Sequence, residues 1–270
     1  MRVAVVGHVE WVEFARVERV PTPGEIVQAG EWWSEPAGGG GVASVQLARL
    51  AGGCTLFTAL GRDRLGERAR EELTRLGVAV EAARHEEPQR RGFTFIDRGG
   101  ERTITILGEK HIARGSDPLP WESLGEADAV YFVSGDAEAL RAARAARVLV
   151  ATARVLPTIA ASGVELDALV RSGSDRSERY EPGDLAPEPR LVVATSAGRG
   201  GSWRTAGGGS GSYEAAPLPG PRVDAYGAGD SFAAGLTYAL GEGLRLEEAL
   251  GLAAGCGAEA LTRAGAHGRS

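Results

Sequence analysis

Asp224-Ala-Tyr-Gly-Ala-Gly-Asp230 places three small residues directly before an acid in this chain of 270 residues. After Asp230, apolar residues recur with the spacing of a helix that buries one face, at Phe232, Ala233, Leu236 and Leu240. The stretch therefore predicts a loop that opens into a helix N-terminus. Unpaired backbone N–H groups and the positive end of the helix dipole make such a terminus a binding site for anions.

An acid at an anion site has a specific chemical use. Asp230 can accept the proton of a hydroxyl that attacks a phosphoryl group, while the amides of Gly227, Ala228 and Gly229 stabilise the charge that develops. The alternative interpretation is structural, because Asp is a favoured helix cap and Gly-x-Gly triplets occur by chance in a chain with 40 Gly. Segments elsewhere in the chain favour the catalytic interpretation.

Further segments match one enzyme family in order, namely Pro21-Thr-Pro-Gly-Glu25, Gly38–Gly41, Gly61-Arg-Asp-Arg-Leu-Gly66, Asp175-Arg-Ser-Glu178 and Thr195-Ser-Ala-Gly198 with Gly200. Together with 224–230, they resemble the motifs of the ribokinase-like (PfkB) carbohydrate kinases, whose C-terminal signature is Asp-Thr-x-Gly-Ala-Gly-Asp. The resemblance extends from about residue 3 to about residue 266. It implies ATP-dependent transfer of the γ-phosphoryl group to an alcohol of a sugar, sugar phosphate or nucleoside.

Strand and helix patterns alternate along most of the chain. Apolar runs predict strands at 3–6, 56–60, 129–133, 148–151 and 191–195, and amphipathic patterns predict helices at 42–51, 66–76, 136–146, 230–240 and 246–263. This alternation predicts an α/β fold with a mostly parallel central sheet covered on both faces. The resemblance implies a three-layer αβα sandwich, a single domain over 1–270, and a small β-sheet lid from about 10–37 and 88–107.

The resemblance also implies roles for individual residues. The glycines at 38–40 would contact the acceptor, and the strand-end turn would line the nucleotide through Thr195, Gly198 and Gly200, with Asp224 nearby. Glu178 and Asp175 would lie near the magnesium–phosphate region. The segment that begins at Asp224 often carries a monovalent-cation site in relatives, but Ala225 and Tyr226 replace the usual Thr.

The acceptor end departs most from the family pattern. Val12 stands where an Asp usually binds sugar hydroxyls, and the flanking Glu10 and Glu13 are the nearest substitutes. Of the motif Asp-x-Asn-x-Arg that relatives carry, only Arg154 is present. The pattern therefore leaves the acceptor open, and we expect His8 and His267 to be surface or packing residues.

Composition excludes several classes of protein. A net charge of −6 and dispersed basic residues argue against a nucleic-acid footprint. The first apolar run, Val3–Val6, is too short for a signal peptide or a membrane span, so we expect a cytoplasmic protein that does not associate with membranes. Lys110 is the only Lys, so no Walker-type lysine is present. Cys54 and Cys256 are predicted to be buried free thiols.

Two other classes of function fit the sequence less well. A catalytically weak ligand-binding or regulatory protein on the same scaffold would explain the altered acceptor residues, although the intact signature favours the kinase. A nicotinamide-dependent enzyme needs Gly-x-Gly-x-x-Gly after the first strand, which Gly7-His-Val-Glu10 does not supply. Relatives often dimerise through their lids, and we expect a homodimer here through an exposed aromatic cluster at Trp11, Phe14, Trp32 and Trp33.

Overall fold

The central sheet confirms the predicted α/β architecture. The computed structural model describes residues 1–268, and in this range one sheet has nine strands in the order β13-β12-β11-β10-β9-β8-β1-β4-β5. Its parallel strands are β1 (Val3–Val6), β4 (Cys54–Gly61), β5 (Val78–His85), β8 (Ala129–Phe132), β9 (Val148–Thr152), β10 (Ala168–Ser172) and β11 (Leu191–Thr195). An antiparallel hairpin, β12 (Gly201–Thr205) and β13 (Ser210–Tyr213), continues the sheet beyond β11.

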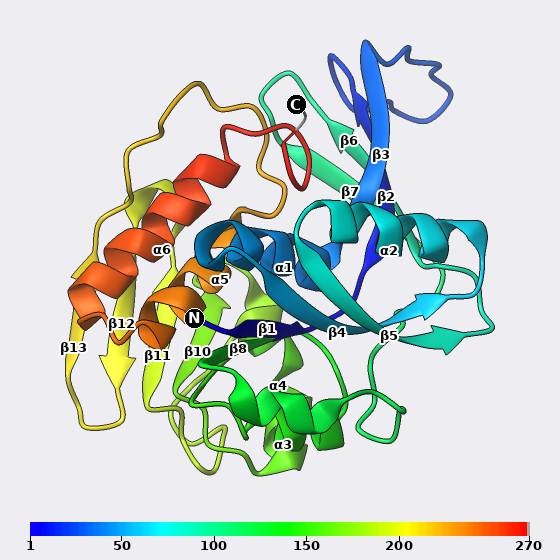
Figure 1. The fold of residues 1–270 in the computed structure, drawn as a ribbon. Helices are drawn as coiled ribbons and strands as arrows, with labels where there is room; N and C mark the ends of the chain where they lie inside the picture. The colour runs from blue at the N-terminus through cyan, green and yellow to red at the C-terminus, as the bar shows by residue number, and fades with distance from the viewer. Residues whose placement is uncertain (269–270) are drawn as a thin grey trace.

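Helices cover both faces of this sheet and complete the three layers (Figure 1). One face packs against α1 (Gly38–Ala51), α2 (Arg64–Arg75), α5 (Ala228–Gly241) and α6 (Leu246–Ala260). The other face packs against α3 (Ala137–Ala143) and α4 (Leu156–Ser162). Because the strands from β5 to β11 are parallel, their carboxyl ends share one edge of the sheet, and the loops that follow them meet there.

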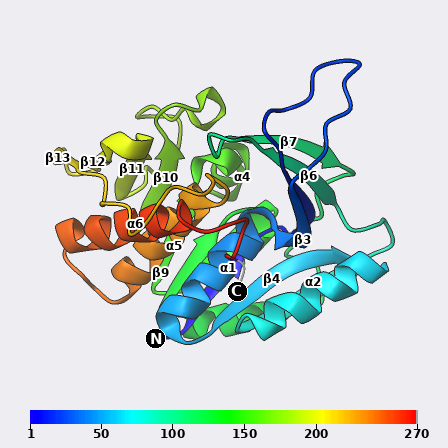
Figure 2. The ribbon, with the colours of Figure 1, turned by 90° about the horizontal axis from the view of Figure 1, so that it is seen from above.

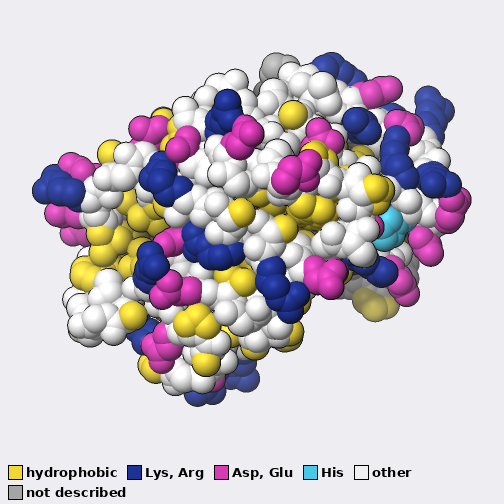
Figure 3. Space-filling view, turned by 60° about the horizontal axis from the view of Figure 1, so that its bottom comes forward, with side chains coloured by type: hydrophobic (Ala, Val, Ile, Leu, Met, Phe, Trp, Pro, Cys, Tyr) yellow, Lys and Arg dark blue, Asp and Glu magenta, His cyan; other side chains and the backbone are white. Residues whose placement is uncertain are grey.

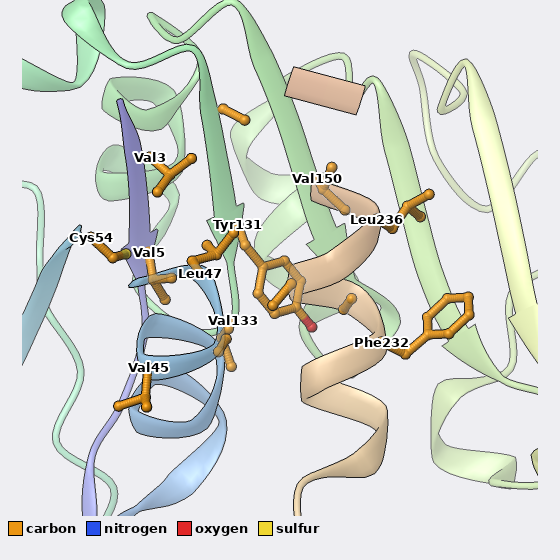
Figure 4. Packing of buried hydrophobic residues seen from close by; sticks show 14 of the residues in the cluster. Val3, Val5, Val45, Leu47, Cys54, Tyr131, Val133, Val150, Phe232 and Leu236 are labelled. Atoms are coloured by element: carbon orange, nitrogen blue, oxygen red, sulfur yellow. The ribbon is translucent and has the colours of Figure 1, made fainter. Parts of the chain in front are cut away.

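Strand β1 shows how the sequence produces these layers. Val3 and Val5 belong to the core on the α1 side, whereas Ala4 and Val6 belong to the core on the α3 side. Figure 4 shows Val5 beside Leu47 of α1. A strand buried on both faces needs a continuous apolar run, and each fully buried Val stabilises the fold by roughly 1.5–3 kcal/mol.

A second sheet projects from one end of the main body (Figure 2). It contains β2 (Glu10–Arg16), β3 (Glu31–Ala37), β6 (Arg91–Ile96) and β7 (Arg102–Leu107) in the order β3-β2-β6-β7. The two segments that the resemblance assigned to a lid therefore pair with each other, through β2 and β6. We call this second sheet the lid sheet.

The expected exposed aromatic cluster is wrong for three of its four members. Trp11, Phe14 and Trp33 are buried, and the rings of Phe14 and Trp33 stack with their centroids 5.1 Å apart. Arg68 of α2 covers Trp11, with its guanidinium carbon 4.4 Å from the ring centroid. These rings hold the lid sheet to the main body, whereas Trp32 is 73% exposed.

Some element boundaries also differ from the expectations. Helix α1 begins at Gly38 rather than at residue 42, so the glycines form its first turn. A Cβ on Gly40 would lie 2.7 Å from the carbonyl oxygen of His8, which accepts a hydrogen bond from the Gly40 amide at 3.0 Å. Only glycine permits this close approach of backbones. Strands β5 and β10 and helix α4 were not anticipated.

Other features of composition have the expected structural counterparts. Cys54 and Cys256 are buried free thiols, and burial raises the pKa of Cys256 to about 11. On the face in Figure 3, acidic and basic side chains are interspersed rather than segregated by sign. Within residues 1–268, none of the helices combines the length and the apolar character required to span a bilayer.

The C-terminal segment is anchored by a buried histidine. Nε2 of His267 donates to the carbonyl oxygen of Pro36 at 2.6 Å, and its Nδ1 is buried without a hydrogen-bond partner among residues 1–268. Burial lowers the pKa of His267 from 6.5 to about 4. Protonation of Nδ1 would therefore place an uncompensated charge in the interior.

We predict that His267 makes the fold sensitive to mild acid. Its pKa is lower in the folded state, so the unfolded state binds more protons, and stability is lost as the pH falls from 6.5 towards 4. Between pH 7 and 5 the native protein should lose about 2 kcal/mol more unfolding free energy than His267→Gln. Urea titrations of both proteins at each pH measure this difference. Equal losses would show that His267 does not titrate on unfolding.

Candidate active site

The N-terminus of α5 lies at the carboxyl edge of the central sheet. Gly227 is the N-cap residue with φ +73°, a left-handed conformation that glycine adopts readily, and its side-chain-free Cα packs on Val42. Asp230 lies in the first turn, and its side chain is 13% exposed. The amides of this turn have no partner inside the helix, which leaves them free for an anion.

Asp230 is not acting as a helix cap in this structure. Its Oδ1 accepts a hydrogen bond from Nη1 of Arg154 at 3.0 Å, and no backbone amide of the described residues donates to it. A Cβ built on Gly39 would lie 3.2 Å from the same Oδ1 atom. Asp230 therefore faces the glycine turn of α1 on one side and the amides of its own helix on the other.

Arg154 connects two loops that follow neighbouring strands. It lies in the short 3-10 helix η2 (Ala153–Val155) after β9, and its Nε donates to Oε1 of Glu178 at 2.9 Å. The other oxygen of Glu178 accepts the amide of Ser172 at 2.6 Å, at the end of β10. The carboxylates of Asp230 and Glu178 raise the pKa of Arg154, with Asp230 the larger cause.

Asp175 lies apart from this network. It caps the 3-10 helix η3 (Arg176–Glu178), and its Oδ1 accepts hydrogen bonds from the Ser177 amide at 2.8 Å and hydroxyl at 2.7 Å. These bonds lower the pKa of Asp175. In residues 1–268 no cluster of three or more acidic, His or Cys side chains forms a ready-made metal site.

Glu10 lies beside the glycine turn and is buried. Its Oε1 is 3.1 Å from Nε of Arg90 and 3.7 Å from Nε2 of His8. Burial raises the pKa of Glu10, and the charge of Arg90 partly offsets this effect. The amide of Gly38 meets the Tyr226 hydroxyl at 3.4 Å, which joins this corner to the loop before α5.

Glu13 does not share this pocket. Residues three apart on a strand point to opposite faces, and Glu13 forms an ion pair with Arg91 of the neighbouring strand β6. Its side chain is 32% exposed, against 7% for Glu10. Of the two predicted substitutes for the missing Asp, the structure brings only Glu10 to the glycine turn.

The predicted nucleotide residues fall into two groups. Thr195 ends β11, and Gly198 and Gly200 belong to the turn that follows it, at the same sheet edge as α5. Gly200 has φ +79° and packs against the backbone of Tyr213, so a larger residue would not fit. Asp224, in contrast, is fully buried.

Both oxygens of Asp224 accept backbone amides, from Tyr226 at 2.8 Å and from Gly265 at 2.7 Å. This arrangement ties the loop before α5 to the C-terminal segment. It gives Asp224 a structural role instead of the predicted contact with nucleotide.

Sequence reasoning missed three residues near the acceptor side. Nδ1 of His8 lies 3.1 Å from the Ser134 hydroxyl, and burial lowers the pKa of His8 well below its usual value. His8 directly follows Gly7 after the end of β1. This position at the carboxyl end of a parallel strand could have indicated a site residue. The second residue, Arg90, forms an ion pair with Glu10. The third is Lys110, whose pKa is lowered by burial and by the positive charge of Arg90.

A separate hollow of about 550 Å³ is lined by residues that include Arg171, Tyr180 and Arg204. It contains none of the residues described above. We therefore place the candidate site at the carboxyl edge of the sheet, where Arg154, Glu178 and Asp230 meet, and not in this hollow.

Comparisons with known proteins agree with this geometry. A family model described as pfkB family carbohydrate kinase matches residues 1–157 and 165–269. No curated protein matches the sequence significantly.

Several solved structures share the fold at low sequence identity. Ribokinase from Thermotoga maritima has a TM-score of 0.79 at 21% identity, covering 99% of this chain and 95% of that one. Arabidopsis thaliana ribokinase, solved with ribose and ATP, has a TM-score of 0.75 at 20% identity, covering 98% and 93%. Adenosine kinase from Sinorhizobium meliloti has a TM-score of 0.77 at 19% identity, covering 99% and 95%.

These likenesses establish the fold, and the family match spans nearly the whole chain. The signature at 224–230 lies at a helix N-terminus beside the glycine turn of α1, a position that favours anion binding. The chain belongs to the pfkB family of carbohydrate kinases.

Proposed function

We propose that this kinase transfers the γ-phosphoryl group of ATP to an alcohol of a sugar, sugar phosphate or nucleoside, with Asp230 as general base. The observation that carries the proposal is the position of Asp230. Its Oδ1 faces Gly39 on the acceptor side, and it lies in the first turn of α5, whose amides face the phosphoryl side. This position supports a carboxylate that acts between the acceptor and the transferring phosphoryl group.

Each group of residues has one role in the proposed transfer. The acceptor lies over the glycines at 38–40, with Glu10 holding its hydroxyl groups in a buried pocket. Asp230 accepts the proton of the attacking hydroxyl as the oxygen bonds to phosphorus. The amides of Gly227, Ala228 and Gly229 stabilise the charge on the transferring group, and ADP leaves.

Magnesium would enter this site with the nucleotide. Mg²⁺ typically binds through substrate phosphates, waters and one or two carboxylates, so the small number of acids here fits it. Glu178 is the buried carboxylate nearest to the Arg154–Asp230 pair, and Thr195, Gly198 and Gly200 would line the nucleotide. When bound, the ion neutralises charge on the phosphates.

The test is a screen of sugars, sugar phosphates and nucleosides with ATP and Mg²⁺, followed by ADP release and identification of the phosphorylated product. Acceptor-dependent ADP formation is the expected result. Tight ATP binding with no turnover on any acceptor would instead favour a regulatory protein on the same scaffold. Such a protein would still use the described nucleotide site.

We also propose a homodimer that forms through the lid sheet. Strand β7 is exposed along its whole length and presents a free edge with apolar side chains, as Ile104 and Ile106 are each 40% exposed. Unpaired apolar edges favour pairing with another chain. Trp32 adds a further exposed apolar group on the same sheet.

We predict twice the mass of the 28.1 kDa chain by light scattering. Ile104→Lys combined with Ile106→Lys should give a monomer, because charges on the edge oppose pairing. Leu218→Lys is the matched control, since Leu218 is 44% exposed but lies outside the lid sheet. A monomeric native protein would contradict the proposal.

A further inference from the structure

Arg154 makes contacts on both sides of the proposed reaction. Its Nη1 holds Oδ1 of Asp230, which is the oxygen that faces Gly39 and the acceptor pocket. A Cβ built on Gly229 would lie 3.8 Å from Nη2 of the same guanidinium. The guanidinium therefore binds Asp230 through Nη1. Its Nη2, which donates no hydrogen bond in the described residues, lies near Gly229 in the first turn of α5.

This arrangement competes with catalysis if it persists. The acceptor hydroxyl needs a lone pair on Oδ1 of Asp230 as its proton acceptor, and Nη1 of Arg154 already uses one of the two lone pairs there. The free Nη2 is a donor to which a phosphoryl oxygen would bind strongly, because guanidinium pairs well with phosphate in a forked geometry. The side chain of Arg154 is 42% exposed, so it has room to move, while Glu178 holds it through Nε.

We infer that Arg154 is a movable counter-charge that leaves Asp230 for the γ-phosphoryl group when ATP binds, and thereby frees the base. The inference rests on the proposed phosphoryl transfer. Glu178 is the pivot, because its bond to Nε does not have to break during the exchange. Arg154 then contacts the transferring group directly and is a catalytic residue.

In the reaction that follows the exchange, one bond to the γ-phosphorus forms and one breaks. The hydroxyl proton passes to Asp230, the acceptor oxygen bonds to the γ-phosphorus, and the bond from that phosphorus to the β-phosphate oxygen breaks, so ADP carries away the electron pair. Arg154 accepts neither a proton nor a phosphoryl group. Its positive charge stabilises the negative charge on the transferring phosphoryl group, to which the amides and the helix dipole of α5 contribute only partial charges.

The test is a double-mutant cycle on nucleotide binding. Calorimetry with Mg²⁺ measures ATP and ADP affinity in the native protein, in Asp230→Asn, in Arg154→Gln and in the double variant. Asp230→Asn should bind ATP roughly tenfold more tightly, because Asn competes weakly for the guanidinium, and ADP affinity should stay unchanged. Arg154→Gln should bind ATP roughly tenfold more weakly.

The double variant decides between two explanations. If Arg154 moves as inferred, Asp230→Asn no longer tightens ATP binding once Arg154 is Gln. If the tightening persists in the double variant, simple repulsion between Asp230 and phosphate explains it, and the inference is overturned. The absence of any tightening in Asp230→Asn would overturn it as well.

Chemical rescue by guanidinium ions separates a catalytic role of Arg154 from a loss of folding. Arg154→Ala should lose activity and regain part of it when guanidinium ions are added, whereas sodium at the same ionic strength should have no effect. A lack of rescue in a variant with native thermal stability would contradict the inference. If the native protein phosphorylates no acceptor, the proposed function fails, while the ATP-binding cycle still reports on Arg154.

Discussion

Asp230→Asn should lower kcat by roughly two to four orders of magnitude, because an amide cannot accept the proton of the acceptor hydroxyl. The loss should appear in kcat with ADP affinity nearly unchanged, since the amides at 227–229 and the helix dipole remain. The fold should persist, because no backbone amide in the described part of the chain donates to the carboxylate of Asp230. Steady-state kinetics on the best acceptor, with calorimetric titration of ADP, measures both quantities.

Asp136→Asn is the matched control for this experiment. Asp136 is the N-cap of α3 and accepts the amides of Ala139 at 2.8 Å and Gly115 at 2.9 Å, on the other face of the sheet. Asn caps helices as well as Asp does, so this variant should retain native activity. If Asp230→Asn also phosphorylates the acceptor at the native rate, Asp230 is not the base.

Glu10→Gln should lower kcat/KM for the acceptor roughly 10- to 100-fold, through the loss of a charge-assisted hydrogen bond. The carboxylate is buried, so water cannot replace the interaction, and Arg90 loses the partner that lies 3.1 Å away. ATP affinity should not change, since Glu10 lies on the acceptor side. Acceptor titrations at saturating ATP measure the effect.

Glu13→Gln provides the comparison, because it removes the same charge from the opposite face of β2. Its ion pair with Arg91 is partly exposed and contributes little, so kcat/KM should change by less than about twofold. Similar losses in the two variants would mean that charge on the lid sheet, rather than contact with the acceptor, determines binding. A loss confined to Glu13→Gln would overturn the assignment of Glu10.

The sequence alone determined the class of fold and the position of the family signature at 224–230. Alternation of apolar runs with amphipathic patterns depends on neighbouring residues, so the parallel sheet and the helix after Asp230 could be predicted locally. The motif order then indicated the kinase family. Strands such as β5 (Val78–His85) escaped notice because their alternation is irregular, with Glu81 and Arg84 among apolar residues.

Tertiary structure alone decided which side chains meet. Arg154, Glu178 and Asp230 are distant in sequence, and only the shared edge of a parallel sheet brings their loops together. The choice of Glu10 over Glu13 depended on which face of β2 turns inward. Sequence spacing places a residue on an element, but the packing of that element against others determines the environment of its side chain, because contacts between distant segments are not encoded in local periodicity.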